Sequence, residues 1–278
     1  MLYLGLIGYP VKHSVSPEMH NAALKKAGVD AIYLAFEVRP DQLEDAIKGA
    51  KALGFLGLNV TLPYKEEILN FVKAVGDASK INAANTLDLR NMLGYNTDVF
   101  GVEEAFKNAG VIIEGKKALV VGSGGAGKAC AYALLKNGAE VILTNRTVQR
   151  GIETAEILRR YGFCIFHPYE KLEELEGKLD IIVNATTLGM VGFENKIPVP
   201  ESILNDVVVF DTVYNPIETP LISLAKKMGC KVINGVEMLV YQGAKAFEIW
   251  TGLKPDVDLM REVAIKSITK SYKTFQNS

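Results

Sequence analysis

The chain has 278 residues, of which 49% are hydrophobic, and its formal net charge is −1. This length accommodates one large or two ordinary domains, and the near-neutral charge gives no electrostatic case for nucleic acid or an anionic membrane as a partner. The three cysteines, an odd number with no CxxC pair, favour a reducing compartment over a disulfide scaffold.

The N-terminal residues, MLYLGLIGYPVKHS, are apolar but lack a basic leader and a cleavage site, so they predict a first strand and not a signal peptide. No stretch approaches the roughly 20 apolar residues that span a bilayer. We therefore expect a soluble, cytoplasmic protein. His13, His20 and His167 do not lie at ligand spacing from a cysteine, so no metal site is predicted.

The first hundred residues alternate predicted strands with predicted helices. The apolar runs typical of strands are Leu2–Gly8, Ala31–Val38 and Phe55–Thr61. Helices are predicted at Pro17–Ala27, after Ser16 as N-cap, and at Asp41–Leu53. Pro63 opens a further predicted helix, which carries Lys65. This alternation predicts a mainly parallel sheet.

A hairpin and a long helix are predicted next. Thr86–Leu89 and Met92–Tyr95 are expected to pair over Arg90-Asn91. A helix then runs from about Asp98 to Asn108. Because no linker rich in Pro, Gly or Ser separates the two halves of the chain, we expect this helix to connect them.

A second alternation begins at Lys116. Its predicted strands are Lys117–Val121, Glu140–Thr144, Asp180–Asn184, Val207–Asp211 and Lys231–Ile233. The C-terminal region is typical of helices, from about Met238 to Thr251 and from Asp256 onward, and we expect these helices to pack back on the first domain. The predicted fold class is α/β, with two α/β domains.

The segment GSGGAGKA, Gly122 to Ala129, fits two phosphate-binding patterns, the dinucleotide fingerprint GxGxxG and most of a P-loop. A P-loop needs Ser or Thr after its lysine to hold magnesium, but Ala129 follows Lys128, which is then interpreted as a solvated residue. A preceding apolar strand and a following helix favour dinucleotide binding over a ligand-free tight turn. The cofactor loop comprises Gly122, Ser123, Gly124, Gly125, Ala126 and Gly127.

The strand after this loop ends in Asn145, Arg146 and Thr147, and Arg150 follows four residues beyond Arg146. A site for NAD usually places Asp or Glu here to bind the ribose 2′-hydroxyl. Two guanidinium groups suit a 2′-phosphate instead, so the sequence predicts NADP as cofactor, with solvated surface arginines as the alternative.

Short polar side chains gather in four segments of the first domain that lie at or near predicted strand ends. These segments are Ser14–Pro17, Asn59–Lys65, Asn82–Thr86 and Asn96–Asp98. Because ligands bind at the carboxyl ends of parallel strands, we expect a substrate pocket there. Hydroxyl and amide groups suit a polyhydroxylated substrate, and a lysine with an aspartate suits proton transfer.

Together these segments resemble the shikimate dehydrogenase family along the whole chain. The matching motifs, in order, are SxSP, NVTxPxK, AxNT, NTD, GxGGAxxA, NRT, NAT at Asn184–Thr186, DxxYxP at Asp211–Pro216 and GxxMLxxQ at Gly235–Gln242. The resemblance implies an oxidoreductase for the reversible, NADP-dependent reduction of 3-dehydroshikimate to shikimate in aromatic amino-acid biosynthesis. It implies a small-molecule substrate and a monomer or homodimer.

The resemblance also implies domains and residue roles. The substrate-binding domain would comprise residues 1–102 plus about 240–278, and the Rossmann-type NADP-binding domain residues 103–239. Lys65 and Asp98 would be the catalytic pair. The substrate would contact Ser14, Ser16, Thr61, Asn85, Gln242 and Tyr214 in addition to that pair. Asn145, Arg146, Thr147 and Arg150 would surround the adenosine phosphate, and Thr186, Val213 and Gly235 would lie near the nicotinamide.

Several of these residues have a purely structural alternative. Lys65 fits a surface position, Asp98 a helix N-cap, Asn85 a turn and Gln242 a solvated helix face. Rival functions are a quinate/shikimate dehydrogenase, a nucleotide-binding regulator without catalysis and a P-loop NTPase. The absence of an acid from the adenosine site argues against the first rival. The presence of both Lys65 and Asp98 argues against the second, and Ala129 argues against the third.

Overall fold

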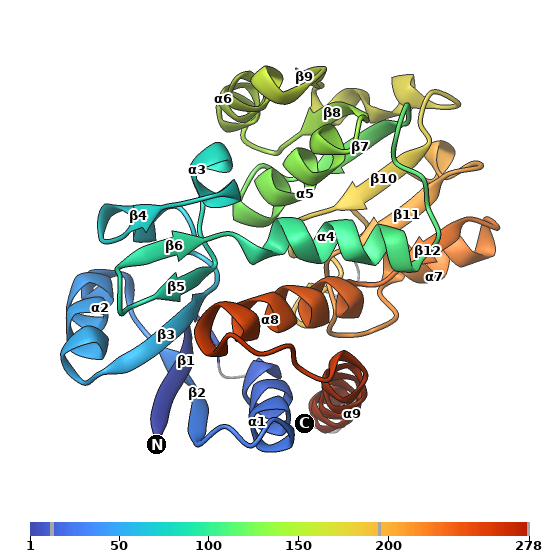
Figure 1. The fold of residues 1–278 in the computed structure, drawn as a ribbon. Coiled ribbons are helices and arrows are strands. Elements are labelled where there is room, and N and C mark those ends of the chain that lie inside the picture. The colour runs from blue at the N-terminus through green and yellow to red at the C-terminus, as the bar shows by residue number, and fades with distance from the viewer. Residues whose placement is uncertain (12–13, 194–195, 277–278) are drawn as a thin grey trace. The chain divides into compact units, whose positions relative to one another are not determined.

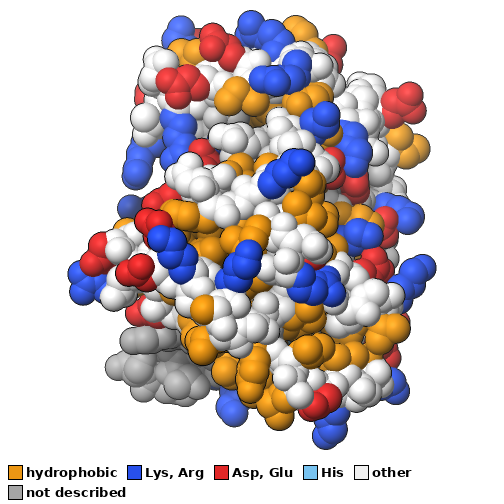
Figure 2. Space-filling view, turned by 60° about the vertical axis from the view of Figure 1, so that its left-hand side comes forward, with side chains coloured by type: hydrophobic (Ala, Val, Ile, Leu, Met, Phe, Trp, Pro, Cys, Tyr) orange, Lys and Arg blue, Asp and Glu red, His pale blue; other side chains and the backbone are white. Residues whose placement is uncertain are grey.

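A computed structural model describes residues 1–11, 14–193 and 196–276, so His13 lies outside the described residues. The chain divides into two compact units (Figure 1). The first comprises Met1–Gly101 with Val240–Ser271, and the second comprises Val102–Leu239 with the end of the chain from Tyr272. The chain passes between them within the helices α4 (Thr97–Asn108) and α8 (Gly235–Thr251). The face drawn in Figure 2 carries both basic and acidic side chains.

The first unit is built on a six-stranded sheet with the order β2-β1-β3-β5-β6-β4. The strands are β1 (Leu2–Gly8), β2 (Ala31–Glu37), β3 (Phe55–Val60), β4 (Lys73–Ala74), β5 (Thr86–Asp88) and β6 (Leu93–Tyr95). The predicted hairpin is confirmed, with Thr86 opposite Tyr95. β5 runs antiparallel to both β3 and β6, but the other five strands all run in one direction, so the prediction of a mainly parallel sheet is confirmed.

Further helices belong wholly or in part to this unit: α1 (Ser16–Lys26), α2 (Leu43–Ala52), α3 (Asp77–Ile81), α8 and α9 (Val257–Gln276). The unit also contains the 3-10 turns η1 (Pro40–Gln42) and η2 (Glu67–Asn70). The return of the C-terminal helices to the first domain is confirmed. Trp250 of α8 is buried and donates its indole N–H to the Leu87 carbonyl at 2.9 Å. Its ring lies against Gly57 of β3, where a Cβ would come within 2.0 Å of the indole nitrogen.

The helix predicted from Pro63 is wrong, because Lys65 lies in a turn between β3 and η2. The Tyr64 N–H donates to the Thr61 carbonyl at 3.0 Å and closes this turn immediately after the strand. The Tyr64 ring is fully buried, and its hydroxyl donates to the Val38 carbonyl. A tertiary contact thus anchors Tyr64 and sets the local backbone where sequence propensity alone favoured a helix.

The N-cap predicted at Ser16 is also wrong, and so is the alternative of an N-cap at Asp98. Ser16 is the first residue of α1 and not its N-cap, which is Val15. The Ser14 hydroxyl accepts the Ser16 N–H at 3.3 Å, so Ser14 supplies the local partner that was expected of Ser16. At the start of α4, the Asn96 side-chain oxygen accepts the Val99 N–H at 3.3 Å. Asn96, and not Asp98, therefore caps this helix.

The second unit contains a six-stranded, fully parallel sheet with the order β12-β11-β10-β7-β8-β9. Its strands are β7 (Lys117–Val121), β8 (Glu140–Thr144), β9 (Cys164–Phe166), β10 (Ile181–Asn184), β11 (Val208–Asp211) and β12 (Lys231–Ile233). Read from β9, this is the strand order 3-2-1-4-5-6 of the Rossmann fold. The strand β9 is too short to stand out in the sequence, and it was not predicted.

The helices of this unit are α5 (Gly125–Lys136), α6 (Val148–Leu158) and α7 (Pro220–Lys227), with the 3-10 turns η3 (Arg159–Tyr161), η4 (Tyr169–Leu175) and η5 (Glu201–Ile203). Every residue of α5 from Gly127 to Leu135 is buried. Lys128 is among them, at 5% exposure, so its interpretation as a solvated residue is wrong. The small and apolar residues on all sides of this helix indicate a buried helix, and they bury the lysine with it.

Candidate active site

The four polar segments of the first unit meet at one edge of its sheet. Ser14 follows β1 and Thr61 follows β3, and these two strands are adjacent and parallel. Asn85 precedes β5, which runs antiparallel to β3, and Asp98 follows β6, which runs antiparallel to β5. Because β5 runs in the opposite direction, its start lies at the same edge of the sheet as the ends of β1, β3 and β6.

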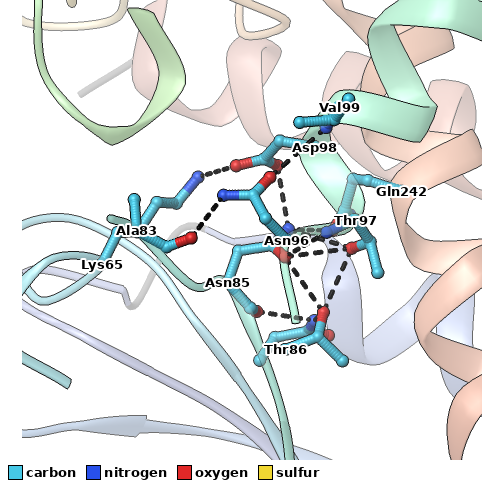
Figure 3. Close-up of polar contacts among 10 residues, drawn as sticks. Lys65, Ala83, Asn85, Thr86, Asn96, Thr97, Asp98, Val99 and Gln242 are labelled. Carbon is cyan, nitrogen blue, oxygen red and sulfur yellow. Dashed lines mark hydrogen bonds and ion pairs between the residues drawn. The ribbon is translucent and has the colours of Figure 1, made fainter. Parts of the chain in front are cut away.

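Lys65 and Asp98 form an ion pair at this edge, with 2.5 Å between Lys65 Nζ and Asp98 Oδ2. The side chains are 17% and 5% exposed, so Lys65 is not the surface residue of its structural alternative. Figure 3 shows the lysine extending from its turn toward the carboxylate on the first turn of α4. An ammonium group and a carboxylate in contact and largely shielded from water are equipped for proton transfer to a bound molecule.

Asn85 is the centre of the polar network around this pair and is 3% exposed. Its side-chain nitrogen donates to Asp98 Oδ1 at 2.9 Å and to Thr97 Oγ1 at 3.0 Å. Its side-chain oxygen accepts the Thr97 N–H at 2.7 Å, and Thr86 Oγ1 lies 3.2 Å from it (Figure 3). The alternative of a simple turn residue is wrong, because Asn85 orients the carboxylate that holds Lys65.

Gln242 reaches the same network from α8, with its side-chain oxygen 3.2 Å from the Asn85 side-chain nitrogen. It is 9% exposed, so the solvated helix face of the structural alternative is wrong here too. The two residues are 157 positions apart in the chain, and only the return of α8 to the first unit brings them together.

Ser16 is buried at the start of α1, and Thr61 is half-buried just after β3, where its N–H donates to the Ile7 carbonyl at 2.9 Å. Tyr214 is half-buried in the second unit, in the segment after β11. The contacts of Ser14, Ser16, Thr61 and Tyr214 with substrate stay predictions. Asn59, Thr86 and Thr97 belong to the motifs noted in the sequence, but no role was predicted for them.

The glycine loop of the second unit joins the end of β7 to the start of α5, as predicted. A Cβ on Gly127 would lie 2.0 Å from the Gly122 carbonyl oxygen, and one on Gly122, whose φ is +110°, would lie 2.8 Å from the Ala185 carbonyl oxygen. A Cβ on Gly124 would meet nothing within 4 Å. The turn is therefore as tight as glycine allows, with open space over Gly124 beside the first free N–H groups of α5. This arrangement fits a dinucleotide pyrophosphate.

Asn145 ties this loop to the segment that carries the arginines. Its side-chain oxygen accepts the Ser123 N–H at 3.2 Å, and its side-chain nitrogen donates to the Thr147 carbonyl at 2.9 Å. Thr147 is the N-cap residue of α6. Arg146 and Arg150 are exposed just before and within the first turn of that helix. Two exposed guanidinium groups next to the glycine loop suit the 2′-phosphate of NADP.

A buried polar cluster lies at the carboxyl ends of β10 and β11. Asp211 accepts hydrogen bonds from the Thr219 hydroxyl at 2.6 Å, the Asn184 side chain at 2.9 Å and the Val213 N–H at 3.0 Å. Asn184 Oδ1 accepts in turn the backbone N–H and the hydroxyl of Thr186, at 3.0 and 2.7 Å. The sequence motifs contained Asn184 and Asp211, but no role was predicted for either. They shape the loops that carry Thr186 and Val213.

Gly235 stands at the start of α8, where a Cβ would lie 2.3 Å from the Thr212 carbonyl oxygen. The helix therefore begins in close contact with the backbone next to Val213, and only glycine permits this approach.

Burial raises the pKa of the Asp211 carboxyl from 3.8 to about 6. The folded chain thus binds this proton more tightly than the unfolded chain, and the resulting stabilisation is complete below about pH 4 and lost as the pH rises through about 6. We expect the wild type to lose about 2 kcal/mol of unfolding free energy relative to Asp211→Asn between pH 4 and pH 7.5. Urea unfolding of both proteins across this range measures the difference, and parallel pH curves would contradict it.

Three family models match the chain. They are the shikimate dehydrogenase substrate binding domain at residues 6–87, shikimate / quinate 5-dehydrogenase at residues 103–196 and the shikimate 5′-dehydrogenase C-terminal domain at residues 235–265. The chain belongs to the shikimate dehydrogenase family. The resemblance read from the motifs is thereby confirmed, together with the α/β fold class of a substrate domain and a Rossmann-type domain.

Relatives of this family member resemble it over nearly the whole chain. A shikimate dehydrogenase (NADP(+)) from Archaeoglobus fulgidus is 63% identical over 96% of this chain and 99% of its own. A shikimate 5-dehydrogenase from Thermus thermophilus, solved in complex with NADP(H) and shikimate, is 38% identical with a TM-score of 0.86, covering 96% of this chain and 100% of that one. A further shikimate dehydrogenase, solved in complex with NADP+, is 40% identical with a TM-score of 0.90, and 96% of each chain is covered.

In the part of the chain that the structure describes, no helix is both long and apolar enough to cross a membrane. Within the same residues, no group of three or more His, Cys, Asp or Glu side chains is arranged to hold a metal ion.

Proposed function

We propose that this chain catalyses the reversible, NADP-dependent reduction of 3-dehydroshikimate to shikimate, a step of aromatic amino-acid biosynthesis. The observation that carries the proposal is the shielded ion pair of Lys65 and Asp98, oriented by Asn85. Lys65 and Asn85 lie within residues 6–87, the segment that matches the substrate binding domain of the family. Membership of the family supports an oxidoreductase with NADP as its cofactor.

In this mechanism NADPH, when bound, supplies the hydride for the C3 carbonyl of the substrate. Lys65 donates a proton to the carbonyl oxygen as negative charge develops there, or it holds this oxygen while a water molecule donates. Asp98 accepts the hydrogen bond from Lys65 Nζ and keeps the ammonium group in place. Asn85 keeps the carboxylate in place through Asp98 Oδ1. In the oxidative direction, the proton of the substrate hydroxyl leaves along the same path, through Lys65 or through the water molecule.

Substrate binding is assigned to residues 1–102 with about 240–278, and NADP binding to residues 103–239. The substrate contacts would be Ser14, Ser16, Thr61, Asn85, Tyr214 and Gln242 in addition to the catalytic pair. The glycine loop Gly122–Gly127 would hold the pyrophosphate, and Thr186, Val213 and Gly235 would lie near the nicotinamide. The protein would act in the cytoplasm as a monomer or homodimer, and light scattering of the purified protein distinguishes the two states.

The reaction is tested by absorbance at the reduced-nicotinamide band in four mixtures, which pair shikimate or quinate with NADP⁺ or NAD⁺. A rise with shikimate and NADP⁺ alone is the expected result. A rise with quinate and NAD⁺ as well would assign the broader activity that the matched shikimate / quinate 5-dehydrogenase model also covers. No rise in any mixture, with NADP⁺ still binding, would overturn the proposal in favour of a nucleotide-binding regulator.

The choice of NADP over NAD is expected to depend on Arg146 and Arg150. Each charge-assisted hydrogen bond to a 2′-phosphate contributes about 1.5 to 3 kcal/mol, so Arg146→Ala with Arg150→Ala should raise KM for NADP⁺ about 100-fold or more. The KM for NAD⁺, which lacks this phosphate, should change less than about threefold. Arg160→Ala removes an exposed arginine from the same unit and serves as the control. Equal effects on the two cofactors would show that neither arginine binds the phosphate.

A further inference from the structure

A buried chain of hydrogen bonds links Tyr33 on β2 to the Lys65–Asp98 pair. Tyr33 is fully buried, and its hydroxyl donates to Asn59 Oδ1 on β3 at 2.8 Å. Asn59 Nδ2 donates to the Asn85 carbonyl at 3.1 Å and to Thr86 Oγ1 at 3.0 Å. Asn59 thus lies between the tyrosine hydroxyl and the residue that orients Asp98.

The direction of each bond in this chain is set by chemistry. The Asn85 carbonyl accepts hydrogen bonds and cannot donate, so the nitrogen of the Asn59 amide must face it. The Asn59 oxygen must then face Tyr33, which has to donate. If the tyrosine hydroxyl were removed, Asn59 would keep a buried oxygen without this donor. A flipped amide would place its oxygen against the Asn85 carbonyl oxygen, so rotation offers no relief.

Thr86 continues the chain toward the pair. Its hydroxyl lies 3.1 Å from Thr97 Oγ1 and 3.2 Å from Asn85 Oδ1, and all three side chains are buried (Figure 3). Asn85 then donates to Asp98 Oδ1. Because every member is buried and hydrogen-bonded, displacement of Asn59 shifts the groups that hold the carboxylate.

Tyr33 is held in place by one contact to its backbone and one to its ring. Asn21 of α1 clamps its backbone, donating to the Tyr33 carbonyl at 2.8 Å and accepting the Tyr33 N–H at 2.9 Å. The His20 ring stacks on the tyrosine ring with 4.3 Å between centroids and 8° between planes. Burial lowers the pKa of His20 to about 3, so this stack is uncharged at neutral pH. The hydroxyl is thus presented to Asn59 by a rigid support.

The geometry points to Tyr33 as a positioning residue for the catalytic pair, acting through Asn59 and Asn85 on Asp98. This assignment rests on the proposed function, because the pair it positions is assigned to that reaction. Tyr33 has no contact with substrate in this scheme, so its contribution belongs to kcat and not to cofactor binding.

Tyr33→Phe should lower kcat for shikimate oxidation about tenfold and change KM for NADP⁺ less than twofold. Tyr169→Phe is the matched control, because it removes a tyrosine hydroxyl that donates to the Pro198 carbonyl in the second unit. Its kcat should equal that of the wild type. In a Lys65→Ala background, Tyr33→Phe should cost less than twofold, because the group it positions is gone. A tenfold loss in both backgrounds would show a merely structural role, and an unchanged kcat in Tyr33→Phe would also overturn the inference.

A second arm needs no substrate. The unfolding equilibrium constants of Tyr33→Phe, Asp98→Asn and the double variant form a double-mutant cycle. This cycle measures the energetic coupling between Tyr33 and Asp98 along the path of hydrogen bonds. Coupled residues should give a combined effect at least threefold smaller than the product of the single effects. Strictly multiplicative effects would overturn the inference. Failure of the proposed reaction would appear separately, as a wild type that is inactive with shikimate and NADP⁺.

Discussion

Lys65→Ala is expected to lower kcat for shikimate oxidation by about 10³-fold, because a positioned general acid or base contributes about 10² to 10⁴. Lys65 Nζ lies 2.5 Å from Asp98 Oδ2 in a site largely shielded from water. Alanine removes the ammonium group that Asp98 holds in place. The affinity for NADP should stay nearly unchanged, since the glycine loop and the arginines belong to the other unit. Steady-state kinetics and a titration of NADP binding measure the two quantities.

The control for this variant is Lys73→Ala, which removes an exposed lysine from β4 of the same unit. It makes the same change in net charge without touching the network, so kcat should stay within about twofold of the wild type. If Lys65→Ala abolished NADP binding while turnover per bound cofactor was preserved, the assignment of Lys65 to proton transfer would be wrong.

Gly127→Ala is expected to destabilise the second unit by about 2 kcal/mol, the upper end of the overpacking cost less the helix gain, and to abolish measurable NADP binding. The new Cβ would lie 2.0 Å from the Gly122 carbonyl oxygen and 2.6 Å from its carbon, and neither backbone atom gives way as the end of a flexible side chain would. Alanine is favoured over glycine inside a helix by about 1 kcal/mol. Overpacking costs about 1 to 3 kcal/mol or more, so the overlap outweighs the gain.

Gly124→Ala is the matched control in the same loop. A Cβ there meets nothing within 4 Å, and φ of −75° is available to any residue, so the unfolding free energy should stay within about 0.5 kcal/mol. If pyrophosphate approaches this backbone, the control should still weaken NADP binding. Urea unfolding and NADP titration of both variants separate the two effects. Equal stability of Gly127→Ala and the wild type would refute the steric argument.

Local sequence patterns were sufficient where an element is long or carries a strong marker. The bounds of β1, β7, β8 and β12 are those predicted, because each is an apolar run between turn residues. The glycine loop was recognised from its place between a strand and a helix. The short strands β4 and β9 were missed, whereas the three-residue β12 was found, because two or three residues carry so little periodicity that strands this short are recognised inconsistently.

The sequence likewise predicted some features of the candidate site and missed others. The residue types Lys65, Asp98 and Asn85 were evident from their motifs, and so was the family to which those motifs belong. The burial of Gln242 was not, because an amide on a helix has the same local sequence signal whether it faces water or a network. The turn that carries Lys65 was also missed, since the buried Tyr64 that anchors it makes its contact with Val38 on the chain segment after β2.

The sequence by itself determined the α/β alternation, the glycine loop, the acid-free adenosine segment and the chemical groups available for catalysis, because these depend on residue type and on spacing along the chain. Only the tertiary structure decided the antiparallel pairing of β5 with β3, the contact between Lys65 and Asp98, and the path from Tyr33 through Asn59 to Asn85. These depend on which strands become neighbours and on the return of α8 to the first unit. Such pairings are set by packing between segments up to 163 residues apart, and no local pattern encodes them.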